Sequence, residues 1–175
     1  DLFDSWMEYK KVVPKGSIRF LGKLAELSDR GIDIIIFTGN HDLWMHGYFE
    51  QELHAVVCKQ VETISINGKI FHIGHGDGLL PAERPYRYLK QLLHHPISQA
   101  IYRQLHPDLG LRLADYFSRL GPKHKYEDLQ MQNPEKEYQI QYAKLVLQKQ
   151  AVDTFIFGHR HIACCIELNN SSTFI

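Results

Sequence analysis

The sequence lacks the features that would place it in a specialised class of protein. It contains three cysteines, two of them adjacent and none in a Cys-x-x-Cys spacing. Neither a disulfide framework nor a thiolate zinc site is therefore expected, and a reducing cytoplasm fits this usage best. No apolar run approaches the roughly 20 residues that span a bilayer. Compositional bias is absent too, because 44% hydrophobic and 23% charged residues are ordinary globular values, which excludes disordered and collagen-like classes.

Net charge is also lacking, since 20 basic side chains balance 20 acidic ones. This balance argues against nucleic acid as a partner held by general electrostatic attraction. The length of 175 residues suits about one domain. Histidine is the one residue in excess, with 11 copies, and imidazole is the commonest metal ligand in proteins.

Hydrophobic periodicity predicts a mixed α/β chain. Apolar spacing in residues 15–30 indicates a helix, and Gly31 follows as its stop signal. The Asn67-Gly68 pair between two β-rich runs is typical of a hairpin. The predicted strands lie at 32–37, 61–66, 69–73, 154–157 and in a final pair that begins at 162, and several helices broken by prolines lie between 85 and 150.

Three of the predicted strands each end in a glycine-containing loop that bears Asn or His. The carboxyl ends of neighbouring strands meet in α/β folds, so these loops are expected to converge. Their oxygen and nitrogen donors suit Mn²⁺, Fe²⁺ or Zn²⁺. Each loop alone is more typical of an ordinary turn, but three in this order favour a metal site that supports hydrolysis. The loops are Gly39-Asn40-His41-Asp42, Gly74-His75-Gly76-Asp77 and Gly158-His159-Arg160-His161.

The three loops, together with the opening Asp1-Leu2-Phe3-Asp4, resemble the ordered sequence blocks of calcineurin-like metallophosphoesterases. The resemblance implies a four-layer αββα sandwich with a helical cap insertion and a two-metal centre at the strand ends. It divides the chain into a first core part (1–80), a cap insertion (81–150) and a last core part (151–175). We expect the sequence to be a piece of this fold, truncated at both ends.

The same resemblance implies a set of metal ligands. Asp1 would bridge two divalent ions, for which we expect Mn²⁺. Asn40, His75 and His159 would complete one ion, and His161 would bind the other. The Asp-x-His block that the family carries on its opening strand is absent from this sequence. We therefore expect this piece alone to bind at most one ion well and to be impaired as an enzyme.

His41 and Asp42 are the predicted catalytic pair. His41 follows a ligand in the motif, so it is placed to protonate the leaving oxygen or to hydrogen-bond a phosphoryl oxygen. Asp42 is available to orient its ring. The best-known proteobacterial members carry Arg at the position of His41, and an Arg could only stabilise charge. Asp77, two residues after His75, could orient a ligand.

Four residues after the second loop are candidates for substrate binding. Glu83 and Tyr86 match family positions, although the family usually has Asp where this chain has Glu83. Arg87 and Lys90 could hold a diphosphate or a sugar, or could be ordinary solvated side chains. Residues 81–126 carry eight basic and three acidic side chains, a local balance of +5. That balance would favour an anionic substrate or lipid surface.

Within the family, the opening and the helical insertion are most similar to the diphosphatases of lipid A synthesis, in the form found in Bacteroidetes-type bacteria. The resemblance implies a UDP-linked diacylated sugar as substrate, with hydrolysis of its diphosphate to UMP and a lipid monophosphate. It also implies a cytoplasmic enzyme, peripheral on the inner membrane. Apolar helix faces in the insertion would cover acyl chains or pack on the core. A different phosphoesterase acting on a nucleotide or phosphoprotein, and an inactive binding module, are the alternatives.

Overall fold

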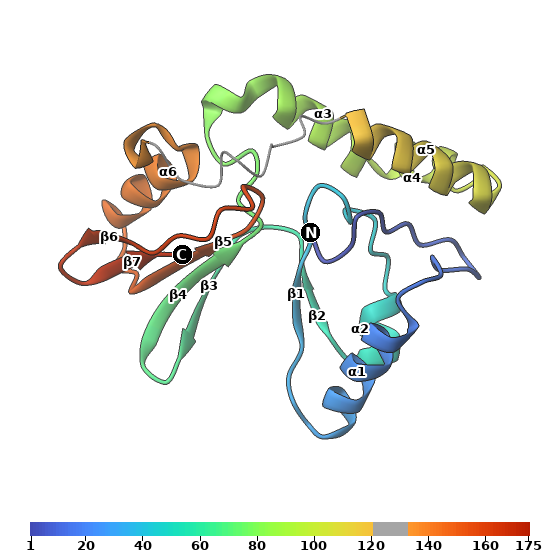
Figure 1. The fold of residues 1–175 in the computed structure, drawn as a ribbon, viewed down its shortest axis with the longest axis horizontal. Coiled ribbons are helices and arrows are strands. Elements are labelled where there is room, and N and C mark those ends of the chain that lie inside the picture. The colour runs from blue at the N-terminus through green and yellow to red at the C-terminus, as the bar shows by residue number, and fades with distance from the viewer. Residues whose placement is uncertain (121–132) are drawn as a thin grey trace. The chain divides into compact units, whose positions relative to one another are not determined.

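The computed structural model describes residues 1–120 and 133–175 and has a mixed α/β architecture. The chain divides into two compact units, each with strands and helices (Figure 1). Unit 1 contains Asp1–Lys59 and Tyr88–Pro122, and unit 2 contains Gln60–Arg87 and Lys123–Ile175. Among the described residues, no helix combines the length and the apolar character needed to cross a bilayer.

Unit 1 begins with a long opening segment and a helix–strand pair. Helix α1 (Ile18–Asp29) and strand β1 (Ile35–Phe37) confirm the predicted helix and strand, with shorter bounds. Helix α2 (Tyr48–Leu53) and strand β2 (Val56–Cys58) were not expected, and β2 pairs in parallel with β1. Buried aromatic and aliphatic side chains form the core of the unit, and they include Trp6, Leu21, Ile36, Met45, Phe49, Leu53 and Ala55.

Three helices occupy residues 84–120, after the second polar loop. They are α3 (Arg84–His94), α4 (Pro96–Tyr102) and α5 (Pro107–Leu120). Helices α4 and α5 each begin with proline. Proline is favourable at the first position of a helix, because the backbone N–H that it lacks would have no partner within the helix. The predicted break at Gly121-Pro122 and the basic residues Lys123 and Lys125 lie outside the described residues.

Unit 2 is built on a five-stranded sheet with the strand order β3-β4-β5-β7-β6 (Figure 1). Strands β3 and β4 form the predicted hairpin, and the strands β6 and β7 form the predicted final pair. Strands β4 and β5 are parallel neighbours, with Gly74 opposite Phe157. The bounds are β3 (Glu62–Ile66), β4 (Lys69–Gly74), β5 (Thr154–Phe157), β6 (Ile166–Asn169) and β7 (Ser172–Phe174).

Helix α6 (Tyr138–Leu147) packs its apolar side on this sheet. Ile140 and Ala143 of α6 contact Phe155 of β5 and Phe174 of β7, and all four side chains are buried. Two 3₁₀ turns, at Pro81–Glu83 and Pro134–Lys136, precede α3 and α6. The packing of α6 brings its first residues to the carboxyl ends of β4 and β5, where the second and third polar loops begin.

Candidate metal centre

The first polar loop, residues 39–42, follows β1 and is bonded to the opening segment of the chain. Asp42 is fully buried and holds the two together. One carboxylate oxygen accepts the backbone N–H groups of Leu2 and Phe3, and the other accepts the N–H of Gly39 at 2.6 Å. Charge-assisted bonds of this kind fix the loop against residues 1–3.

Asp1 lies directly on this loop. Its Oδ1 accepts the backbone N–H of His41 at 2.9 Å. A Cβ atom at Gly39 would lie 2.1 Å from the same oxygen, so only glycine allows this approach. Two predicted ligands, the Asp1 carboxylate and the Asn40 amide, are therefore brought into one loop cluster of unit 1.

The side chain of His41 is oriented by a backbone group. Its Nδ1 lies 3.0 Å from the carbonyl oxygen of Asp4, which fixes the ring when Nδ1 carries the proton. Asp42 had been expected to orient this ring, and its carboxylate oxygens instead accept backbone N–H groups. Asp42 therefore positions His41 through the backbone of the loop. The carbonyl oxygen of Asp4 makes the contact with the His41 ring.

In unit 2, the second and third polar loops begin side by side because β4 and β5 are parallel neighbours. His75 follows the end of β4, and His159 lies two residues after the end of β5. The atoms His75 Nε2 and His159 Nδ1 are 3.2 Å apart and share a hydrogen bond, whose donor is the ring nitrogen that carries the proton. The sequence-based expectation that strand ends would bring these loops together is met within this unit.

The donor set of this histidine pair fits a divalent cation. Two nitrogen ligands at roughly 2.0–2.1 Å from one ion, at the usual angles, lie about 3.0–3.4 Å apart. The observed 3.2 Å falls in this range. Burial lowers the pKa of His159, and the negative charges of Asp77 and Glu83 only partly oppose this. The ring is thereby kept in the neutral form that binds metals.

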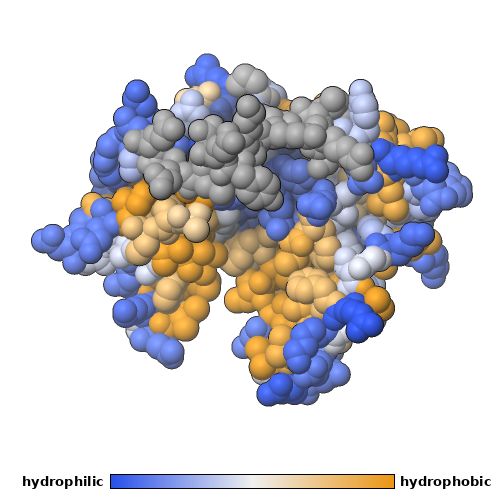
Figure 2. Space-filling model, in the orientation of Figure 1, coloured by the Kyte–Doolittle hydropathy of each residue, from blue (hydrophilic) through white to orange (hydrophobic). Residues whose placement is uncertain are grey.

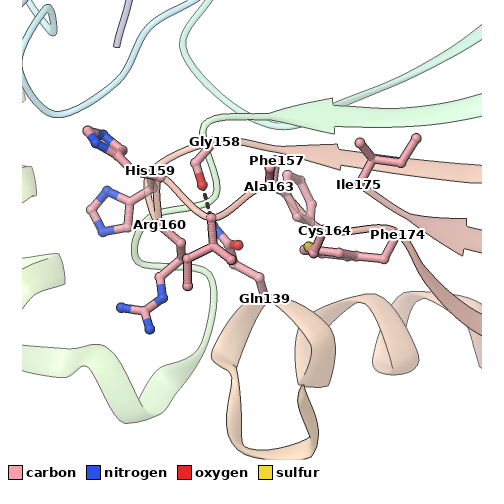
Figure 3. A pocket seen from close by; sticks show the side chains of 11 residues that line it. Gln139, Phe157, Gly158, His159, Arg160, Ala163, Cys164, Phe174 and Ile175 are labelled. Carbon is pink, nitrogen blue, oxygen red and sulfur yellow. Dashed lines mark hydrogen bonds between the residues drawn. The ribbon is translucent and has the colours of Figure 1, made fainter. Parts of the chain in front are cut away.

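His161 lies on the same loop as His159 and is exposed. Both residues adopt left-handed backbone angles, with φ of +67° at His159 and +54° at His161. Both also line a pocket of about 350 Å³ in unit 2, part of which is drawn in Figure 3. Non-glycine residues rarely adopt this conformation, and at binding sites it is held by surrounding contacts.

The loop after His75 is fixed by residues that follow it in the chain. The hydroxyl of Tyr86 donates to Asp77 Oδ2, and Asp77 is 4% exposed. Burial, together with the charge of Asp77, raises the pKa of Tyr86 well above its ordinary value, so the phenol stays protonated and donates. Glu83 accepts the backbone N–H groups of Gly78 at 3.2 Å and Leu80 at 3.1 Å.

These contacts bear on the predicted substrate-binding residues. The hydrogen bonds of Glu83 and Tyr86 described above are made to the loop itself, whereas Arg87 is exposed and Lys90 half-buried on α3. Sequence reasoning missed Gln139 and Glu137, which reach the second and third loops from the start of α6. No local pattern could have identified them, because their partners lie up to 63 residues away.

The predicted ligands thus fall into two groups, each described within its own unit. Asp1 and Asn40 belong to unit 1, and His75, His159 and His161 belong to unit 2. Across residues 1–120 and 133–175, no three His, Cys, Asp or Glu side chains form one cluster that could hold a metal ion. The number and identity of bound ions therefore stay predictions.

Comparison with models of known protein families finds no match. Curated relatives named UDP-2,3-diacylglucosamine hydrolase do match, and they include the three proteins described next. The protein of Porphyromonas gingivalis is 38% identical over 93% of this chain and 67% of its own length. Those of Pseudomonas fluorescens and Edwardsiella ictaluri are 27% and 25% identical over 92% of this chain. The chain spans 63% and 61% of these two relatives.

Proposed function

We propose, from the premise that this chain belongs to the UDP-2,3-diacylglucosamine hydrolase family, that the whole protein hydrolyses the diphosphate of UDP-2,3-diacylglucosamine. The products would be UMP and 2,3-diacylglucosamine 1-phosphate, which serve lipid A biosynthesis. The 38% identity to the Porphyromonas protein extends over 93% of the chain, so it includes all three polar loops. This breadth supports a shared reaction better than a single shared motif would.

The proposed cofactors are two divalent cations, with Mn²⁺ as the expected ion. The ligands proposed for them are Asp1, Asn40, His75, His159 and His161. Their oxygen and imidazole donors suit Mn²⁺, and no thiolate is among them. When bound, such ions polarise phosphoryl oxygens and lower the pKa of a bound water. The neutral state of His159 and the 3.2 Å spacing of the histidine nitrogens support this assignment.

His41 is proposed to act on the leaving oxygen. With Nδ1 held by the carbonyl of Asp4, its Nε2 is the nitrogen that can hold or give a proton. Asp42 keeps His41 in place by binding the backbone of the loop and of residues 2–3. In this proposal, His41 donates the proton to the leaving oxygen. Asp42 fixes the loop on which His41 lies.

Tyr86 and Glu83 are proposed to shape the substrate site by holding the loop of residues 75–78. Arg87 and Lys90, on the same helix, are proposed to bind the diphosphate or the sugar. Arg87 is exposed and so can reach a substrate, and its guanidinium can bind two phosphate oxygens at once.

The fold that we propose around these residues is the four-layer αββα sandwich, with residues 81–150 as its cap.

The helices of unit 1 carry apolar side chains at the surface. Ile97 and Ile101 of α4 are 62% and 66% exposed, and Leu92 of α3 is 61% exposed. Figure 2 shows orange apolar surface among blue polar groups over α4 and α5. Contiguous exposed apolar surface commonly marks an interaction site. We propose that they contact acyl chains, and that the protein is peripheral on the cytoplasmic side of the inner membrane.

The observation that carries the proposal is the 3.2 Å approach of His75 Nε2 to His159 Nδ1 at adjacent strand ends. The test is UMP release from UDP-2,3-diacylglucosamine by the whole protein, with and without added Mn²⁺. Metal-dependent release is the expected result. Cleavage of a generic phosphodiester without UMP release would overturn the substrate and keep the reaction class. No hydrolysis of either compound would favour a binding module.

A further inference from the structure

Gln139, the second residue of α6, connects the two histidine loops of unit 2. The residue is 5% exposed. Its Nε2 donates to the carbonyl oxygen of Gly76 at 3.1 Å and to that of Gly158 at 3.0 Å. Figure 3 shows Gln139 directed at Gly158, with the second of these bonds dashed. A single buried carboxamide therefore joins segments that begin at two different strands.

Both residues that supply these carbonyls are chain neighbours of a proposed metal ligand. Gly76 follows His75, and Gly158 precedes His159. A carboxamide nitrogen has two hydrogens, so it can satisfy both acceptors at once, which a hydroxyl or a carboxylate cannot do. The bonds fix the peptide group between Gly158 and His159 and the one between Gly76 and Asp77, one residue beyond His75, and so limit how far the two imidazoles can separate.

The third loop has a second attachment to the same helix end. Arg160 forms an ion pair with Glu137, in which Nη2 donates a hydrogen bond to Oε1 at 3.0 Å and Nε lies 3.0 Å from Oε2. This charge-assisted hydrogen bond attaches the third loop to the residue that precedes α6. The left-handed backbone at His159 needs an external restraint of this kind to persist.

The second loop is adapted to the same contact. Gly76 has φ of +94°, and a Cβ atom there would lie 2.2 Å from Gln139 Nε2. The loop therefore approaches Gln139 as closely as a residue without a side chain permits. The second loop thus packs directly on this buried amide, which also holds the third loop by the hydrogen bond to Gly158.

We propose that Gln139 is a positioning residue that sets the separation of the His75 and His159 imidazoles and thereby the affinity for a divalent cation. The cation part of this inference rests on the proposed function. The geometric part does not, since it concerns the histidine pair alone. A merely structural Gln139 would affect the stability of unit 2 and leave both the imidazole geometry and the cation affinity unchanged.

The test compares Gln139→Met with Gln141→Met in the whole protein. Methionine keeps the length of the side chain and removes both donors. Gln141 is the matched control, because its Nε2 also donates to a backbone carbonyl, that of Glu135, at an exposed place on the same helix. The two readouts are the imidazole ¹⁵N resonances of His75 and His159 without metal, and the Mn²⁺ dissociation constant from the free-ion EPR signal.

Gln139→Met is expected to shift both imidazole spectra and to weaken Mn²⁺ binding by roughly 10- to 100-fold, the usual effect of losing a partner that orients ligands. Gln141→Met should match the wild type. Unchanged imidazole spectra in Gln139→Met would overturn the inference. If the wild type binds no Mn²⁺, the proposed function fails while the spectra still decide the role of Gln139. If Gln139→Met does not fold, Gln139→Asn, one methylene shorter, gives the same two readouts.

Discussion

His75 and His41 contribute different groups to the proposed reaction, so their alanine variants should separate binding from proton transfer. His75→Ala removes a proposed metal ligand and is expected to abolish both UMP release and tight Mn²⁺ binding. His41→Ala should keep Mn²⁺ binding and slow turnover by about 10²- to 10⁴-fold, the usual range for a lost general acid. Mn²⁺ titration and initial rates on both variants measure this. Loss of the metal in His41→Ala would contradict the role given to His41.

His46 makes stability dependent on pH at a point away from the proposed ligands. Burial, with the positive charges of Arg103 and Lys59, lowers its pKa to about 4. Its backbone N–H donates to the buried Glu8 carboxylate, while its ring Nε2 is buried without a hydrogen-bond partner among the described residues. Protonation would place a positive charge on this ring, close to the positive charges of Arg103 and Lys59. The folded state therefore takes up a proton on His46 only at about pH 4.

The unfolded chain protonates His46 near pH 6.5, and between that pH and about 4 it binds more protons than the folded state. The free energy of unfolding should therefore decline as the pH falls through this window and level off below it. In His46→Gln, the free energy of unfolding should decline less over this pH window than in the wild type. Urea titrations at several pH values measure the difference. His106→Gln is the control, because the His106 side chain is 75% exposed. Identical pH profiles for wild type and His46→Gln would refute the assignment.

At the scale of elements, α4 carries Ile97 and Ile101, the two most exposed aliphatic side chains that the structure describes between residues 84 and 116. Replacing Ile97 and Ile101 with glutamine should reduce binding to anionic lipid vesicles by roughly 100-fold or more, because each apolar side chain that becomes buried in lipid contributes about 1.5–3 kcal/mol and about 1.4 kcal/mol is a factor of ten. The unfolding midpoint should barely move, since both side chains are already more than 60% exposed. Vesicle sedimentation measures the change.

The matched control for this prediction is Ile18→Gln. Ile18 is also a helical isoleucine, at the start of α1, and is 77% exposed. It should leave vesicle binding unchanged if the contact belongs to α4. An equal loss in both variants would mean that apolar exposure in general, and no particular helix, drives association with lipid.

At the scale of the whole molecule, a bound ion should act as a stabilising ligand. Mn²⁺ at 100 times its dissociation constant is expected to add about 2.7 kcal/mol to the free energy of unfolding, because it binds the folded state alone. EDTA should remove this stabilisation and stop UMP release at the same time. Calorimetry with and without Mn²⁺ measures this. A stabilisation of equal size in His75→Ala would place the ion elsewhere.

Much of the architecture was determined by sequence features that act over a few residues. Asn67 and Gly68 both have positive φ, as the tight turn between β3 and β4 requires, and this pair alone predicted the hairpin. The spacing of apolar residues before Gly31 predicted α1. The polar loops were recognised because buried strands end where glycine and polar residues begin. Such signals are local, so a sequence displays them directly.

Other features arose only from the tertiary structure. Strand β2 has three residues and exists because β1 supplies its hydrogen-bond partners. A segment this short shows no clear hydrophobic periodicity, so the sequence did not predict it. The meeting of His75 with His159 depends on the parallel pairing of β4 and β5, which are separated by about 80 residues. Gln139 has no motif of its own, because its role comes from carbonyls that packing of α6 brings near. The sequence itself determined which residues could bind a metal, and the fold decided which of them meet, because hydrogen bonds between distant segments form only after the chain has packed.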